Sequence, residues 1–202
     1  MAAYDEPEAD QRTGLHARLD VPLRERSNCG VGALVDLTGR KSHALVADSL
    51  RLLENLDHRG ARGAEANTGD GAGILIQIPH ALFADEIDGL GAAHTYAVGQ
   101  LFMPKSPSAQ AALRASIERC VEAEGFDVIA WRDVPTDNAD LGPGALAQEP
   151  AVQQLFVRPK TRLEPDAFDV RVYVLRRVIE QTVATSDLDG REHFYVCTFD
   201  RR

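Results

Sequence analysis

The order in which helical and strand-like patterns follow one another constrains the fold most. Apolar residues repeat with the 3.6-residue period of an amphipathic helix in three stretches of the chain. These repeats consist of Val46, Leu50 and Leu53, of Leu113, Ile117 and Val121, and of Phe168, Val172, Leu175 and Ile179. Strand patterns lie between some of these helices but not between all, which predicts an α+β fold rather than a regular parallel sheet.

Strand patterns fill several of the remaining intervals. Alternating or β-branched apolar runs cover 31–35, 73–79, 96–102, 126–134, 153–157 and the final stretch 191–202. A short helix is expected over 81–87. The final strand ends at polar, turn-like residues with no following partner, so one of its edges stays unpaired. We therefore expect a hairpin cut at its turn and a domain whose C-terminal part is missing.

The chain changes character abruptly at Cys29. Residues 1–28 are polar and hold six acidic residues and four arginines, with no apolar run. A secretory signal needs an apolar segment, so this composition excludes one and predicts an extended leader. We expect residues 1–28 to be a leader or propeptide and residues 29–202 to form the folded domain.

Charge and cysteine content exclude several classes of function. The formal net charge of −9 argues against nucleic-acid binding, which needs clustered Lys and Arg. No stretch approaches the ~20 apolar residues of a membrane span. Cys29, Cys120 and Cys197 have neither disulfide nor zinc spacing, and the histidines lack metal-ligand spacing. We expect a cytoplasmic protein without a bound metal, whose oligomeric state cannot be read from the sequence.

A loop with five glycines connects a helix to a strand over residues 60–73. A phosphate-binding loop follows a strand, opens a helix and carries a lysine. The stretch Asn67–Gly73 has none of these features, so it predicts a tight loop with positive-φ glycines rather than a nucleotide site. Asp70, the one acid in that stretch, either binds backbone amides or orients a neighbour.

His58 and Arg59 end the first helix, ahead of Gly60 as a C′ glycine. One interpretation is a favourable interaction with the helix dipole, worth about 0.3–1 kcal/mol. The other is an arginine held at the helix end so that it binds a carboxylate through two hydrogen bonds.

Cys29 also has two interpretations. A free cysteine is often a small buried hydrophobe. Alternatively, cleavage after Asn28 would give Cys29 an α-amino group whose pKa of about 7.7–8.0 lets it act as base for its own thiol. The thiolate would be the nucleophile, and Gly30 and Gly32 would let substrate and backbone approach closely.

Three motifs occur together in this chain: Cys29-Gly30-Val31-Gly32, the stretch LENLDHRG over 53–60, and the stretch NTGDGAGILIQIPH over 67–80. Together they resemble the class II glutamine amidotransferase domain of the glutamate synthase large subunit. The first two are shared across class II amidotransferases, whereas the third is specific to glutamate synthase. The resemblance covers most of residues 28–202.

This resemblance implies an N-terminal nucleophile (Ntn) hydrolase fold, a four-layer αββα sandwich that is incomplete in this chain. It implies that Cys29, once N-terminal, attacks the side-chain amide of glutamine, and that water hydrolyses the resulting γ-glutamyl thioester after ammonia leaves. It assigns Arg59 to substrate binding. In the whole family enzyme, ammonia reaches 2-oxoglutarate at an FMN site that also depends on an iron–sulfur cluster, and both cofactors and the choice of electron donor lie outside this chain.

Three family features have no counterpart here: an Arg-Phe-Ser-Thr-Asn stretch, the Asn-Gly pair of the oxyanion hole, and the acid that binds the substrate α-amino group. Loss of one oxyanion donor costs about 10²–10³ in rate, so we expect the isolated chain to be nearly inactive. Our hypothesis is an N-terminal fragment of a glutamate synthase large chain. Two alternatives stay open: one half of a split amidotransferase completed by a companion subunit, and a non-catalytic regulatory or assembly module.

Overall fold

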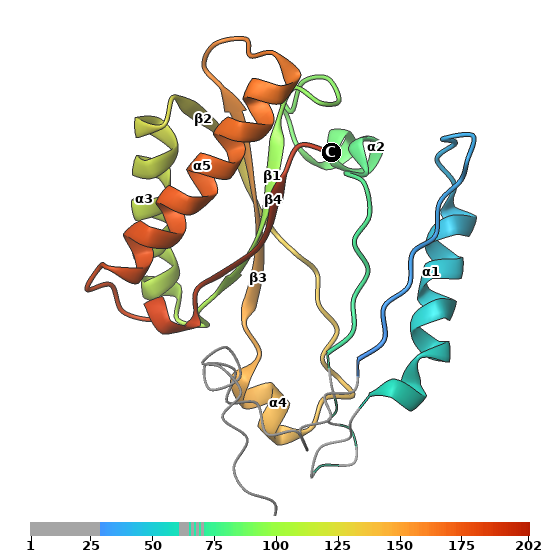
Figure 1. The fold of residues 1–202 in the computed structure, drawn as a ribbon. Helices are drawn as coiled ribbons and strands as arrows, with labels where there is room; N and C mark the ends of the chain where they lie inside the picture. The colour runs from blue at the N-terminus through green and yellow to red at the C-terminus, as the bar shows by residue number, and fades with distance from the viewer. Residues whose placement is uncertain (1–28, 61–64, 66, 68, 70) are drawn as a thin grey trace, which may run out of the picture.

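A computed structural model describes residues 29–60, 65, 67, 69 and 71–202, which fold into helices and an antiparallel sheet (Figure 1). The predicted leader, 1–28, and Asp70 lie outside the described residues. The helices are α1 (His43–Asn55), α2 (His80–Glu86), α3 (Pro107–Ala123), α4 (Pro143–Gln148) and α5 (Pro165–Ala184), with two 3-10 helices, η1 (Asp57–Arg59) and η2 (Arg191–His193). The strands are β1 (Ala97–Met103), β2 (Phe126–Asp133), β3 (Ala151–Pro159) and β4 (Tyr195–Asp200). The predicted α+β class is confirmed.

The sheet has the strand order β2-β3-β1-β4, and each neighbouring pair is antiparallel. β1 and β3 pair without interruption along the whole of β1. The β1–β4 and β2–β3 ladders are each interrupted by one register shift, which is where a strand bends and its twist increases. Side chains alternate between the two faces along each strand, so the sheet presents two separate surfaces for packing.

Helices α3 and α5 cover one face of the sheet and enclose the main core (Figure 1). The apolar stripes predicted from the helical period are the buried ones: Leu113 of α3 and Leu175 of α5 have no exposed surface. At the start of α3, the Ser106 hydroxyl accepts a hydrogen bond from the backbone N–H of Ala109, and Pro107 occupies the first turn. A capping hydroxyl followed by proline at the first helical position is a favourable start for a helix.

The opposite face of the sheet carries a smaller core. Phe83 of α2 packs edge-on against Phe156 of β3, with ring centroids 4.9 Å apart. Tyr96, Leu90 and Ile78 complete this cluster. The short helix predicted over 81–87 is therefore present as α2, one residue earlier, and it anchors the chain on both sides of it to the sheet.

Two of the predicted strands are wrong. The segments 31–35 and 73–79 have no regular secondary structure and run as long coil in Figure 1. Val31, Val35 and Leu75 are all largely exposed. A β-branched run becomes a strand only where a neighbouring strand accepts and donates its hydrogen bonds, and no strand of the described residues pairs with either segment.

The layer of α3 and α5 and the sheet beneath it match two layers of the αββα sandwich. The described residues form one four-stranded sheet and no second one, and the two coil segments predicted as strands pair with none of its strands. Beyond that coil lies α1, which has no buried residue. No helix in the described ranges has both the length and the apolar character that a bilayer crossing requires.

Candidate active site

Cys29 is exposed and opens the coil segment that runs along α1. Two glycines hold this segment close to the helix. A Cβ added to Gly30 would lie 2.8 Å from Leu56 Cδ2, and one added to Gly32 would lie 2.5 Å from Leu52 Cδ1. Only glycine fits such distances without displacing the leucines. The close approach at these glycines is to leucine side chains of α1, and the predicted approach of a substrate stays a prediction.

Arg59 follows α1 through a short 3-10 turn. The Ser42 hydroxyl caps the start of α1 by accepting a hydrogen bond from the Ala44 N–H at 3.1 Å. At the other end, His58 Nδ1 donates to the Asn55 carbonyl at 2.9 Å. His58 thus satisfies a helix-end carbonyl, which supports the capping interpretation for this residue. Arg59 makes no side-chain contact of this kind with a described residue and is exposed.

Gly60 differs from its prediction as a left-handed C′ glycine. Its φ is −87° and its ψ 160°, an extended conformation that any residue can adopt. The reason is that the chain does not leave α1 directly, because η1 intervenes and the Gly60 N–H bonds to the Asp57 carbonyl at 3.1 Å.

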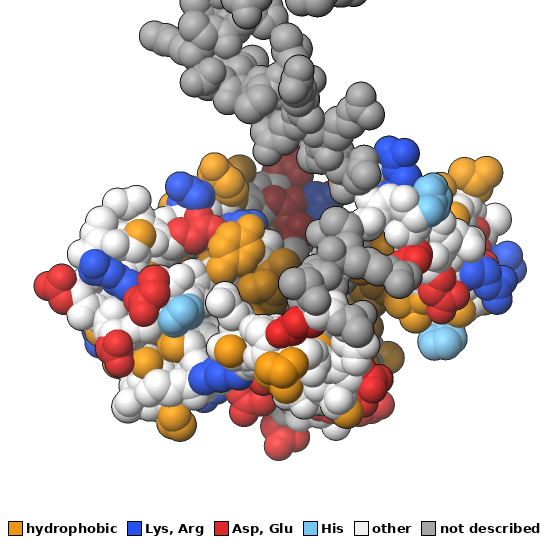
Figure 2. Space-filling model, turned by 90° about the horizontal axis from the view of Figure 1, so that it is seen from below, with side chains coloured by type: hydrophobic (Ala, Val, Ile, Leu, Met, Phe, Trp, Pro, Cys, Tyr) orange, Lys and Arg blue, Asp and Glu red, His pale blue; other side chains and the backbone are white. Residues whose placement is uncertain are grey.

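The fold brings the segment of Cys29 and the turn of Arg59 to the same end of the molecule. Leu56, which contacts Gly30, lies three residues before Arg59. In Figure 1 the described chain begins near the C-terminal end of α1. Figure 2 views the molecule from that end, where hydrophobic side chains lie among charged ones. A thiol and a guanidinium so placed can serve, respectively, as a nucleophile and as a carboxylate-binding group.

The glycine-rich loop is less tightly turned than its composition predicts. A Cβ added to Gly71 or Gly73 would meet no atom within 4 Å, and neither residue has a positive φ. The expectation of positive-φ glycines is therefore wrong at these two positions, where the chain is extended rather than tightly turned. Glu65 ties the loop to α4, because its carboxylate accepts from the Gly144 N–H at 3.0 Å.

The other candidate residues do not join this site. Cys120 is buried in the main core, as its helical spacing predicts. Cys197 was expected on an apolar face of the last strand, but it is exposed, because Val196 beside it faces the main core and Cys197 points to the other side of β4. Among the described residues, no three His, Cys, Asp or Glu side chains form a possible metal site. His80 and His94 line a pocket elsewhere that no spacing in the sequence indicated.

Comparison with known proteins gives one family. The model of the family described as "Glutamine amidotransferases class-II" matches residues 29–202. Similar proteins include ferredoxin-dependent glutamate synthase 2 of Synechocystis, 35% identical over 89% of this chain and 11% of its own length. Glutamate synthase [NADH] of Schizosaccharomyces pombe is 36% identical over 89% of this chain and 9% of its own. Glutamate synthase [NADPH] large chain of Bacillus subtilis is 34% identical over 83% of this chain and 11% of its own length. The chain spans about a tenth of the length of these relatives.

Proposed function

We propose that this chain, which belongs to the class II glutamine amidotransferase family, carries the nucleophile for glutamine amide hydrolysis in a glutamate synthase. The observation that carries the proposal is the family match that starts at Cys29, together with the exposure of that thiol. The glutamate synthases similar to this chain support the choice of enzyme within the family.

Cys29 is the proposed nucleophile, acting after the leader 1–28 is removed. Its new α-amino group takes the thiol proton, and the thiolate adds to the carbon of the glutamine side-chain amide. The C–N bond then breaks, the amine returns the proton, and ammonia leaves a γ-glutamyl thioester. Water, deprotonated by the same amine, hydrolyses the thioester and releases glutamate and the free thiol.

Arg59 is the proposed substrate-binding residue. Arg59 is exposed and follows α1, and the described chain begins near the C-terminal end of that helix (Figure 1). A planar guanidinium binds a carboxylate through two parallel hydrogen bonds, and glutamine offers its α-carboxylate. This contact would fix the substrate by its far end and leave the side-chain amide to reach the thiol.

The use of the ammonia belongs to the larger enzyme. We propose that it reacts with 2-oxoglutarate in a region of glutamate synthase that holds FMN and an iron–sulfur cluster. The cysteines of this chain do not fit a cluster, because Cys120 is buried in the core while Cys29 and Cys197 are exposed on separate segments. Relatives named for ferredoxin, NADH and NADPH are all 34–36% identical to this chain. The residues of this chain therefore do not select the electron donor.

We further propose that the chain alone turns glutamine over slowly. The segment that carries Cys29 belongs to no sheet, and catalytic groups need positioning to within about 0.5 Å. A companion polypeptide that pairs with this segment would raise the rate, as in a split amidotransferase. A non-catalytic module with the same partial fold is the remaining alternative, and the reactivity of Cys29 distinguishes it.

The test measures processing and reactivity separately. Intact mass of the expressed chain reports whether Cys29 has become the N-terminal residue. A glutamine analogue with an electrophile at the side-chain carbon should then label the chain once, and Cys29→Ala should remove the label. Cys197→Ala is the matched control, because Cys197 is also exposed, and it should label normally. Labelling at Cys197, or none at Cys29 after processing, would refute the proposed nucleophile.

A further inference from the structure

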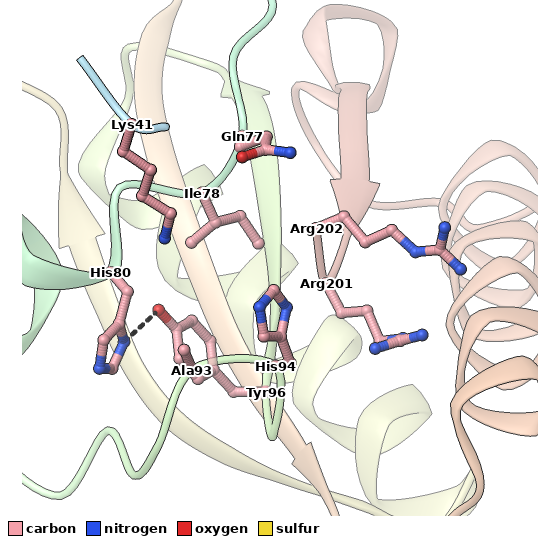
Figure 3. Close-up of a pocket in the computed structure, with 9 residues that line it drawn as sticks. All are labelled: Lys41, Gln77, Ile78, His80, Ala93, His94, Tyr96, Arg201 and Arg202. Carbon is pink, nitrogen blue, oxygen red and sulfur yellow. Dashed lines mark hydrogen bonds between the residues drawn. The ribbon is translucent and has the colours of Figure 1, made fainter. Parts of the chain in front are cut away.

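A small pocket beside the lesser core gathers basic side chains (Figure 3). Its volume is about 100 Å³, and Lys41, Gln77, His80, His94 and Tyr96 contribute polar groups to its lining. Among the described residues that line it, none is acidic. The pocket is thus a locally basic site in a chain whose net charge is −9, and such a concave site concentrates anions.

Lys41 supplies the uncompensated charge of the pocket. Arg201 and Arg202 also line it, but both guanidinium groups pair with Asp169 of α5 and point away from Lys41 in Figure 3. The Lys41 ammonium has no ion pair with a described residue and reaches toward His80 and Tyr96. An anion in the pocket would therefore meet a cation that nothing in the described structure neutralises.

Tyr96 and His80 form a fixed hydrogen-bonding wall. The Tyr96 side chain is 1% exposed, and its hydroxyl lies 3.1 Å from His80 Nδ1. When Nδ1 carries the imidazole proton, it donates to the phenol oxygen and leaves the phenol O–H free to donate to a ligand. Burial raises the pKa of Tyr96, so this hydroxyl keeps its proton at neutral pH.

His94 enters the pocket from a strained backbone position. Its φ is +66°, a left-handed conformation that few residues other than glycine adopt. Strain of this kind concentrates at ligand sites, where the surrounding structure holds it. Figure 3 shows the His94 imidazole inside the pocket, between Tyr96 and the C-terminal arginines. Its ring can donate a second hydrogen bond to a ligand held by Lys41.

We propose that this pocket binds a small oxyanion, either inorganic phosphate or the carboxylate of a small organic acid, through Lys41, His94 and Tyr96. A cavity needs only about 10–15 Å³ of such volume to hold one water molecule, so a volume of about 100 Å³ leaves room for a small oxyanion. Neither Cys29 nor Arg59 lines it, so the site is independent of the proposed glutaminase chemistry.

The test titrates the full 202-residue chain with inorganic phosphate, acetate or chloride at constant ionic strength, followed by calorimetry. Saturable binding of phosphate or acetate is expected, and the tighter of the two identifies the anion. Chloride should not saturate. Lys41→Gln should weaken binding about tenfold, the effect of losing one charge-assisted hydrogen bond. Lys160→Gln, at an exposed lysine paired with Glu122, should leave the affinity unchanged.

His94→Gly separates loss of binding from loss of fold. Glycine accepts the positive φ without strain, so the variant should melt at or above the wild-type temperature while binding the anion several-fold more weakly. The proposal would be overturned if neither phosphate nor acetate showed saturable binding. Equal affinity of wild type and Lys41→Gln, or equal saturable binding of chloride, would overturn it as well, because the site would then not use the ammonium or would not distinguish oxyanions.

Discussion

Replacing Asp169 by asparagine should lower the free energy of unfolding by about 2 kcal/mol at pH 7. Asp169 is the counter-ion of Arg201, a buried arginine at the end of β4. Arg201 bonds to both carboxylate oxygens, with Nη2 3.3 Å from Oδ2. Its guanidinium also lies 5.7 Å from the centre of the Phe168 ring. The substitution would leave this guanidinium buried without a matching charge.

The magnitude follows from the exposure of the two partners. Breaking a fully buried pair costs about 3–5 kcal/mol, whereas an exposed pair is worth about 0.2–1 kcal/mol. The Arg201 side chain is 8% exposed and that of Asp169 32% exposed, which places this pair between the two cases. With a urea m-value of about 2 kcal/mol per molar, the unfolding midpoint should fall by about 1 M.

Urea denaturation monitored by circular dichroism measures this shift, and Glu122→Gln provides the matched control. Glu122 pairs with Lys160, but its side chain is 70% exposed, so its loss should change the free energy of unfolding by less than about 0.5 kcal/mol. If Asp169→Asn shifted the midpoint no more than Glu122→Gln did, the buried pair would not stabilise the end of β4.

Acid pH gives a second readout of the same pair. Hydrogen bonds from Arg201 and then from Arg202 lower the pKa of Asp169 below its ordinary value of 3.8. The stabilisation is therefore present above 3.8 and is lost as the pH falls below that value through the lowered pKa. The difference between wild type and Asp169→Asn should shrink over this range. A difference that grew on acidification would contradict the ion pair as its cause.

Two further substitutions test packing at the sheet and at the Cys29 segment. Gln153→Ala should lower the free energy of unfolding by about 2 kcal/mol, measured by chemical denaturation. Gln153 is 2% exposed and its amide makes three hydrogen bonds, one of them from Arg114 Nε at 3.0 Å. An unfolding midpoint equal to that of the wild type would contradict a stabilising role for these bonds. Gly32→Val should slow labelling of Cys29, because its Cβ would lie 2.5 Å from Leu52 Cδ1, whereas Gly71→Val meets open space and should label at the wild-type rate.

The helices could be predicted from the sequence because their signal is local. The stripe of α5 that contains Leu175 and the stripe of α3 that contains Leu113 each define a face before any partner is known. In the structure those faces are the buried ones. Apolar runs also predicted strands over 96–102 and 153–157, and these are β1 and β3 in the centre of the sheet.

The strand predictions for 31–35 and 73–79 are wrong because strand formation depends on residues elsewhere in the chain. Their apolar content is that of a strand, but hydrogen-bond pairing is a non-local property that a single run does not specify. The basic pocket was missed for a related reason. Lys41, Gln77, His94 and Arg201 come from four separate segments, and only the folded chain brings them together. The roles proposed for Cys29 and Arg59 rest on motifs rather than on geometry.

The position of Cys29 connects the fold to the proposed function. Its segment is held at Gly30 and Gly32 against α1, a helix that itself buries no residue. A nucleophile on such a segment is exposed enough to react but is not fixed as a transition state requires. Labelling of Cys29 by a reactive analogue and slow turnover of glutamine are therefore compatible, because labelling needs an accessible thiolate and turnover also needs preorganised donors for the oxyanion. A mature chain that keeps its leader, or a processed chain whose Cys29 does not react, would favour the non-catalytic alternative.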